Sequence, residues 1–296
     1  MRKISELAGS RILVSDGAWG TFLHQKGLQP GGCPELWNVT HRGIVLDVAR
    51  SYVAVGADMI ETNSFGGSRL KLEKYGLGER AAELNRTAAE ISREAAGDGV
   101  LVLGSVGPTG KMLIMEEASP EEMYEVFREQ AMALEAGGAD AIVVETMTDL
   151  DEAVLAVRAA RENTRLEVIC TMTFDKLITA EYRTMMGISP SDMVQPLLDA
   201  GATILGTNCG NGIAGMIPVV EEIRKCNRDI PILVHANAGI PYYRDGRTVF
   251  PEGPEEMASH VKALIKAGAN IIGGCCGTTP EHIARIKQAV GGGRWL

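Results

Sequence analysis

The sequence predicts an α/β fold, a single-domain (β/α)8 TIM barrel. Eight short apolar or β-branched runs recur along the chain, and segments with helix start and stop signals separate them. Near-continuous apolar runs are typical of parallel strands covered on both faces. Eight strand-helix units also fit a barrel of about 250 residues. A doubly wound open sheet is the alternative, but no Gly-x-Gly-x-x-Gly follows the first run to support it.

The expected strands are short and evenly spaced. In chain order they are residues 11–16, 57–63, 100–105, 141–146, 168–172, 203–208, 232–237 and 270–274. No Pro/Gly/Ser-rich linker interrupts the series, so we expect residues 1–296 to form one domain.

The segments between the strands carry explicit helix boundaries. Ser119 and Pro120 offer an N-cap and a first-turn proline, with Glu122 in the capping-box position. Ser189, Pro190 and Asp192 repeat this pattern, and Gly253-Pro254 and Thr279-Pro280 are weaker variants. Glycines that supply a left-handed C-cap are expected before four strands, at Gly56, Gly138, Gly201 and Gly268.

Composition excludes several classes of function. A formal charge of −9 over 296 residues argues against binding to nucleic acid or to an anionic membrane. No apolar run reaches membrane-spanning length, and the first residues lack the apolar core of a signal peptide, so we expect a cytoplasmic protein. Six cysteines in a chain of this length are not a disulfide framework, and clustered ones suggest metal binding or catalysis.

Three cysteines stand at the ends of two expected strands. Cys275 and Cys276 are adjacent, and neighbours in sequence can rarely close a relaxed disulfide with each other. Cys209 follows another strand in the same way, so in a parallel sheet all three thiols would meet at one edge. Three converging thiolates with an open fourth position describe a catalytic zinc site. We interpret Cys33, Cys170 and Cys226 as structural or incidental.

Polar residues also stand at the carboxyl ends of most other strands, where barrel enzymes place their chemistry. These are Asp16, Glu61, Asn63, Ser105, Glu145, Thr146, Thr173, Asn208 and Asn237. Each has a structural alternative: turn chemistry for Asp16, an ion pair for Glu145, and hydrogen bonds within the loops for Glu61, Asn63 and Asn237. His235 points away from its neighbours by strand alternation, which favours packing over ligation.

Five motifs together resemble the zinc-dependent homocysteine S-methyltransferase family. They are residues 16–21 (DGAWGT), 61–65 (ETNSF), 104–109 (GSVGPT), 208–212 (NCGNG) and 273–278 (GGCCGT). That family includes betaine-homocysteine methyltransferase and the homocysteine-binding module of cobalamin-dependent methionine synthase. The resemblance extends from about residue 4 to residue 290. It implies a homocysteine-binding (β/α)8 barrel in which Cys209, Cys275 and Cys276 hold zinc.

The implied reaction methylates homocysteine to methionine. A free thiol has a pKa of about 8.5 and is mostly protonated at neutral pH, whereas binding as a zinc thiolate deprotonates it. By resemblance, Asp16 and Glu145 are partners for the substrate ammonium. Ser105 and the backbone N–H groups near Gly17, Ala18 and Trp19 are partners for its carboxylate. Glu61, Asn63 and Asn237 complete the candidate set, and the Trp19 ring would shape the donor pocket or cap the barrel mouth.

The methyl donor stays open at this point. The chain ends soon after the eighth unit, so we expect the donor to arrive as a small molecule or on a separate protein. We favour methylcobalamin on a corrinoid protein supplied in trans, with a methyl-donor enzyme as a further partner. An S-methylmethionine- or betaine-type donor and a different acceptor thiol are the alternatives.

Two readings belong to other classes. The first is a phosphate-binding barrel lyase or isomerase without zinc, in which the glycines near residues 273–278 cradle a phosphate. It needs a base such as lysine at a strand end, and none of the eight ends has one. The second is a module that presents homocysteine to an assembly without activity of its own.

Overall fold

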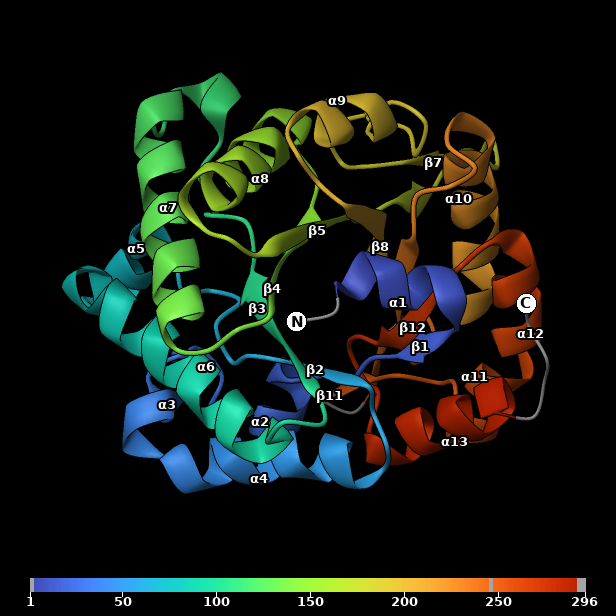
Figure 1. Ribbon diagram of the computed structural model, residues 1–296, viewed down its shortest axis with the longest axis horizontal. Helices are drawn as coiled ribbons and strands as arrows, with labels where there is room; N and C mark the ends of the chain where they lie inside the picture. The colour runs from blue at the N-terminus through green and yellow to red at the C-terminus, as the bar shows by residue number, and fades with distance from the viewer. Residues whose placement is uncertain (1–2, 245–246, 292–296) are drawn as a thin grey trace.

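The predicted (β/α)8 barrel is confirmed by the computed structural model, which describes residues 3–244 and 247–291 (Figure 1). Eight parallel strands form its wall, and each lies where the sequence predicts one. They are β1 (Leu13–Val14), β2 (Met59–Glu61), β3 (Leu101–Val106), β4 (Ala141–Met147), β5 (Glu167–Met172), β8 (Ile204–Gly212), β9 (Ile232–Asn237) and β12 (Ile271–Gly274).

The first and last strands pair with each other, as closure of a barrel requires. Leu13 of β1 aligns with Ile271 of β12, and the sheet continues in the order β12-β9-β8-β5-β4-β3-β2. Asp58 completes the circle between β1 and β2. Its backbone N–H donates to the Val14 carbonyl (2.7 Å), and its Oδ2 accepts from the Val14 N–H (2.8 Å).

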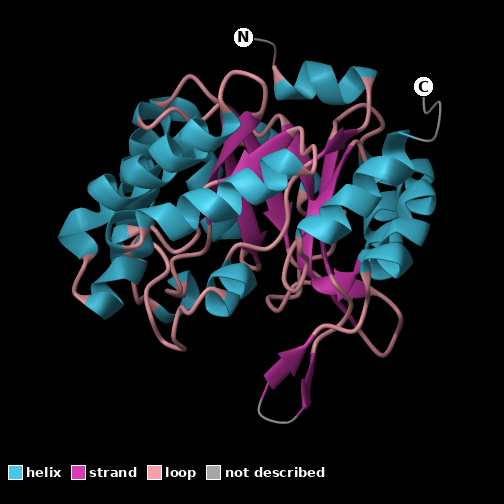
Figure 2. Cartoon of the chain, turned by 90° about the horizontal axis from the view of Figure 1, so that it is seen from below, coloured by secondary structure: helices cyan, strands magenta, loops and turns pink. Residues whose placement is uncertain are grey.

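Helices surround the barrel wall, following the strands in turn (Figure 1). They are α4 (Arg42–Ala54), α6 (Ala81–Ala96), α7 (Pro120–Ala136), α8 (Leu150–Asn163), α9 (Val194–Asp199), α10 (Ile213–Cys226), α11 (Pro254–Ser259), α12 (Val261–Ala267) and α13 (Pro280–Gly291). An additional helix, α1 (Ile4–Ser10), covers one end of the barrel (Figure 2). No helix in the two described ranges is both long and apolar enough to cross a bilayer.

Most of the predicted helix boundaries are confirmed. The Ser119 side chain accepts from Glu122 N–H at the start of α7, and Gly56, Gly138, Gly201 and Gly268 have φ between 87° and 119°. The prediction at Ser189 is wrong, because α9 begins only at Val194. Ser189 and Asp192 do exchange capping-box hydrogen bonds, but these close an isolated turn ahead of the helix.

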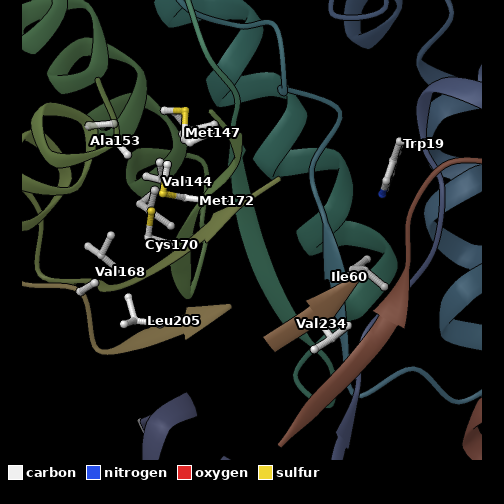
Figure 3. Packing of buried hydrophobic residues seen from close by; sticks show 14 of the residues in the cluster. Trp19, Ile60, Val144, Met147, Ala153, Val168, Cys170, Met172, Leu205 and Val234 are labelled. Atoms are coloured by element: carbon white, nitrogen blue, oxygen red, sulfur yellow. The ribbon is translucent and has the colours of Figure 1, made fainter. Parts of the chain in front are cut away.

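Strand alternation divides the core into an inner and an outer layer. The outer layer lies between strands and helices, and Figure 3 shows part of it, with Val144, Cys170 and Met172 in one group. The inner layer fills the barrel beneath α1. Its strand residues include Leu13, Met59, Leu103, Val143, Ile169, Leu233 and Ile271.

Polar side chains form the next inward layer along the barrel axis. Because inward positions recur every second residue, Met59 is followed by Glu61, Leu103 by Ser105, Val143 by Glu145 and Leu233 by His235. All four polar side chains are buried. The apolar layer therefore closes the amino end of the barrel and leaves the carboxyl end for polar chemistry.

Short helices and hairpins lie in the loops at that carboxyl end. Two hairpins, which the sequence did not predict, join β6 (Asp175–Lys176) to β7 (Tyr182–Arg183) and β10 (Tyr242–Arg244) to β11 (Arg247–Val249). Figure 2 shows the β10–β11 hairpin projecting from the end opposite α1. The remaining short pieces are α2 (Gly20–Gln25), α3 (Trp37–Thr40), α5 (Arg69–Leu72), η1 (Glu73–Tyr75), η2 (Gly78–Arg80) and η3 (Leu113–Met115).

Candidate functional site

The structure brings the thiols of Cys209, Cys275 and Cys276 together at the carboxyl end of the barrel. Their three Sγ atoms all lie within 4.8 Å of one another, and each residue is partly exposed. Cys209 comes from the end of β8, and the adjacent pair follows β12. The other three cysteines lie outside this cluster: Cys33 and Cys170 are buried and Cys226 is exposed.

Local backbone conformation turns Cys209 towards the pair. Cys209 has φ 59° and Gly210 has φ 70°, so two successive left-handed residues interrupt β8. The pairing of β8 with β9 shifts register between Asn208 and Gly212, as a bulge requires. The loop after β12 is fixed independently, because Cys275 N–H donates to the Ala236 carbonyl at 2.7 Å.

The three thiols influence one another's ionisation. Hydrogen bonds from the Cys275 and Cys276 thiols lower the pKa of Cys209 to about 3. The hydrogen bond to Cys209 in turn raises the pKa of Cys275 and of Cys276 above the ordinary value for a thiol. One thiolate is therefore favoured when the cluster is alone, and a cation is needed to hold three.

The donor set fits a zinc ion. Thiolates about 2.3 Å from a tetrahedral zinc lie about 3.8 Å from one another, and these sulfurs are within 4.8 Å. Asn237 also belongs to this end of the site, since its side chain hydrogen-bonds to Cys209 and contributes to the lowered pKa of that thiol. The Asn237 Oδ1 atom is buried and has no hydrogen-bond partner among the described residues.

A cavity of about 360 Å³ opens beside the thiols, within the range of about 300–1,000 Å³ that is usual for small-molecule sites. Most of the predicted site residues line it. These are Gly17, Ala18, Trp19, Glu61, Asn63, Ser105, Glu145, Cys209, Cys275 and Cys276. A larger open groove of about 670 Å³ lies outside the barrel beside α7, and charges that pair with each other, such as Arg69 and Glu129, line it.

Glu145 forms a wall of the cavity and is held from both sides. Its Oε1 accepts from the Ser105 hydroxyl, and its Oε2 lies 3.4 Å from Asn208 Nδ2. Burial, and secondarily the charge of Glu61, raise the pKa of Glu145 well above its ordinary value. A cation entering the cavity would favour the ionised carboxylate and offset that burial cost.

Asp16 lies beneath the first loop and hydrogen-bonds within the protein. Its Oδ2 accepts from Trp19 Nε1 (2.8 Å) and from the Glu61 N–H (2.9 Å). Burial raises the pKa of Asp16 to about 7, and the neighbouring Glu61 adds to the shift. Asp16 thus braces the Trp19 ring, which lines the cavity.

One of the backbone groups predicted to bind the substrate carboxylate is already occupied. Ala18 N–H donates to Thr278 Oγ1 at 3.0 Å. Asn63 is also engaged, because its Nδ2 donates to the Pro34 carbonyl (2.8 Å) and to Asn38 Oδ1 (2.9 Å). These contacts brace the loops that border the cavity.

His235 does point away from Val234 and Ala236, as predicted, and this places it inside the barrel. Its Nδ1 lies 3.3 Å from Glu61 Oε1, and Glu61, Glu145 and His235 form a second close group. Burial raises the pKa of Glu61 to about 8 and lowers the pKa of His235. Counting in twos from the apolar Leu233 would have revealed this position from the sequence.

Comparisons with known proteins agree with this geometry. The profile of the family described as homocysteine S-methyltransferase matches residues 13–290. Methionine synthase from Mycobacterium leprae is 31% identical over 305 residues, which cover 96% of this chain and 25% of that protein. The chain thus spans about a quarter of the length of the curated relatives it matches.

Solved structures show the same barrel. The homocysteine methyltransferase MmuM from Escherichia coli, in its oxidized form, superposes with a TM-score of 0.75 at 25% identity, covering 94% of this chain and 95% of that one. Its metallated form gives a TM-score of 0.79 at 24% identity, covering 96% of this chain and 98% of that one. At 24% identity, the likeness to the metallated form shows the fold alone.

Proposed function

The chain belongs to the homocysteine S-methyltransferase family, and from that premise we propose that it transfers a methyl group to the thiol of homocysteine, forming methionine. The observation that carries this proposal is the convergence of three cysteine thiols on a cavity whose wall holds a buried carboxylate, Glu145. In this proposal residues 1–296 are one homocysteine-binding barrel domain.

We propose that Cys209, Cys275 and Cys276 hold a zinc ion. When bound, zinc would lower the pKa of a substrate thiol at the open fourth position, so that the thiol loses its proton at neutral pH. The protein supplies the fixed sulfur positions, and Asn237 donates a hydrogen bond to one of them. Such outer contacts orient metal ligands and tune their basicity.

The amino-acid end of homocysteine would extend towards Glu145. The Ser105 hydroxyl donates a hydrogen bond to Glu145 Oε1, so we assign Ser105 the role of orienting that carboxylate towards the substrate ammonium. The loop of Gly17, Ala18 and Trp19 borders the same cavity. Because the Ala18 N–H is already bonded to Thr278, the backbone N–H groups of Gly17 and Trp19 would face the substrate carboxylate.

For the donor we propose a methylated corrinoid protein. Exposed apolar side chains are concentrated on three loops at the cavity end of the barrel, and such patches mark protein interaction sites. They are Met112, Ile114 and Met115 after β3, Leu177, Ile178 and Met185 after β5, and Ile240, Tyr242 and Tyr243 after β9. A small S-methylmethionine- or betaine-type donor is the alternative.

The hydrogen bonds of the loop after β12 argue against the phosphate-binding alternative. Gly277 N–H donates to Thr21 Oγ1 (3.2 Å), and Thr278 N–H donates to the Cys275 carbonyl (3.2 Å). The Thr278 hydroxyl also donates to the Cys275 carbonyl (2.7 Å). These groups are therefore already engaged within the protein and are not presented to a phosphate.

The test is to purify the protein under reducing conditions, measure zinc by elemental analysis, and supply homocysteine with either methylcobalamin or S-methylmethionine. Methionine formation with about one zinc per chain supports the proposal, and the productive donor identifies the second substrate. Zinc and homocysteine binding without turnover by any donor would favour the presenting module. A protein that takes up no zinc and forms no methionine would overturn the proposal.

A further inference from the structure

Asn208 connects the thiol cluster to the carboxylate wall of the cavity. It is fully buried within β8, directly before Cys209, where the pairing of β8 with β9 begins to shift register. Its Oδ1 accepts from the Thr146 backbone N–H and from the Thr171 hydroxyl, both at 2.7 Å. Because a backbone N–H can only donate, this contact fixes which amide atom is oxygen and which is nitrogen.

The nitrogen side of the same amide faces the site. Asn208 Nδ2 donates to Thr146 Oγ1 at 2.7 Å, and it also lies 3.4 Å from Glu145 Oε2 and 4.0 Å from Cys275 Sγ. An amide has only two N–H bonds. One is taken by Thr146, so the other lies between the carboxylate and the thiol.

Thr146 is the residue that needs this support. It has φ 60°, a left-handed conformation that is uncommon for any residue except glycine and unfavourable for a β-branched one. It lies where the pairing of β4 with β5 shifts register between Val144 and Met147. Residues held in such conformations persist when the surroundings over-determine them, and Asn208 binds Thr146 twice, at its backbone and at its hydroxyl.

The direction of the Glu145 side chain depends on the left-handed conformation of Thr146. Glu145 directly precedes Thr146, so the left-handed residue ends the regular part of β4 and sets where the Glu145 side chain enters the cavity. The backbone of Asn208 is also held in place, because the Thr173 hydroxyl donates to the Asn208 carbonyl at 2.9 Å. One side chain thereby ties two bulged strand ends into one rigid unit.

We propose that Asn208 is a positioning residue that holds Thr146 in its left-handed conformation and so aims the Glu145 carboxylate at the ammonium group of the amino-acid substrate. This inference rests on the proposed function, since it requires homocysteine to bind in the cavity. Asn208 itself makes no contact with substrate in this assignment. It acts through Thr146, which lies two strands away on β4, beyond β5.

The experiment is a double-mutant cycle on zinc-loaded protein, read out as the homocysteine dissociation constant by calorimetry. Asn208→Ala should weaken homocysteine binding by about 10- to 100-fold, because a misdirected Glu145 loses most of its charged hydrogen bond to the substrate ammonium. Zinc content should stay at the wild-type value, because all three thiols remain. In turnover, the KM for homocysteine should rise by more than kcat falls.

Thr146→Gly provides the decisive arm, since glycine adopts positive φ without the steric cost. Alone it should leave homocysteine affinity within about threefold of wild type, and combined with Asn208→Ala it should recover about tenfold of the lost affinity. Asn211→Ala is the matched control. Asn211 is another buried asparagine of β8, and its Nδ2 donates to the Phe174 carbonyl at 2.6 Å, away from Glu145. We expect it to reduce stability without weakening homocysteine binding.

Two results would overturn the inference: Asn208→Ala binding homocysteine as tightly as wild type, or the double variant binding no better than Asn208→Ala. If Asn208→Ala does not fold, Asn208→Ser is measured in the same cycle with the same expectations. A wild-type protein that is zinc-loaded but binds no homocysteine is a separate outcome. It refutes the proposed function and thereby the premise of the inference.

Discussion

Replacing Glu145 with Gln removes the negative charge from the cavity wall while keeping the shape of the side chain. The variant should fold, because the amide can accept from Asn208 and donate to the Ser105 hydroxyl, which can reverse its own role. The charge attraction to the substrate ammonium, however, is lost. We therefore expect weaker homocysteine binding with zinc content unchanged.

The magnitude follows from the contact that disappears. A hydrogen bond between charged groups contributes about 1.5–3 kcal/mol, and about 1.4 kcal/mol corresponds to a tenfold change in affinity. The dissociation constant of homocysteine should thus rise by about 10- to 140-fold. Because burial raises the pKa of Glu145, part of the binding energy is spent on removing its proton at low pH. The lower end of the range should therefore apply at lower pH, where Glu145 is protonated, and the upper end at higher pH, where it is already ionised.

The assay is calorimetric titration of zinc-loaded protein with homocysteine and with 4-mercaptobutyrate, which keeps the thiol and carboxylate but lacks the ammonium. Glu145→Gln should weaken the first ligand and leave the second nearly unchanged. Glu152→Gln is the control: Glu152 is also a buried carboxyl with a raised pKa, but it hydrogen-bonds to Thr109 away from the cavity. Equal losses for both ligands, or loss of zinc from the Glu145 variant, would refute the assignment of Glu145 to the ammonium.

Three further predictions concern the metal, the buried acids and the donor. Cys276→Ala should lower zinc content from about one per chain to well below half. Cys170→Ala, which changes a buried thiol outside the cluster, should keep the wild-type zinc content. Equal zinc in the two variants would contradict the proposed ligand set. In the ligand-free protein Asp16 and Glu61 should lower stability as pH rises from about 5 to 8, because their folded-state pKa values (about 7 and about 8) lie above those of the unfolded chain and the folded state holds more protons at these two groups. The lowered pKa values of Cys209 and His235 act in the opposite sense, so the measurement compares the melting temperature of Glu61→Gln with that of wild type: the variant should lose less stability across this window, and equal slopes would show that Glu61 ionises freely. Tyr243→Ser on the exposed β10 strand should reduce turnover several-fold with a corrinoid protein and not with free methylcobalamin, and equal effects on both would argue against docking there.

Much of the fold was predictable because it depends on short-range patterns. Apolar runs located the strands, and glycines marked the helix ends with positive φ. The Ser189 prediction failed because a capping box specifies a local turn, and the helix itself began only at Val194. The two hairpins were missed because they lie in loops, where they pair only with themselves.

The site was predictable in its chemistry and less so in its connections. Cysteines after two strands predicted the thiol cluster, since parallel strands end at a common edge. The contacts of Asn208 with Thr146 and Glu145 could not be read from spacing, because they depend on register shifts in β4 and β8. Alternation predicted that His235 points away from its neighbours but not that it lies beside the acids, because its approach to Glu61 is a contact between β9 and β2 across the interior of the barrel.

Closure of the barrel by β1 and β12 also bears on how the protein is made. Ser15 N–H donates to the Ile272 carbonyl, and Gly274 N–H donates to the Asp16 carbonyl, so the loop that lines the cavity is anchored to the last strand. During synthesis β1 emerges early, whereas its partner β12 emerges only with residues 271–274. The edge of β1 that pairs with β12 must remain open until then, and exposed strand edges of this kind are prone to aggregation during folding. Two of the three clustered thiols, Cys275 and Cys276, follow immediately after, so the thiol cluster can assemble only once the final strand has been made.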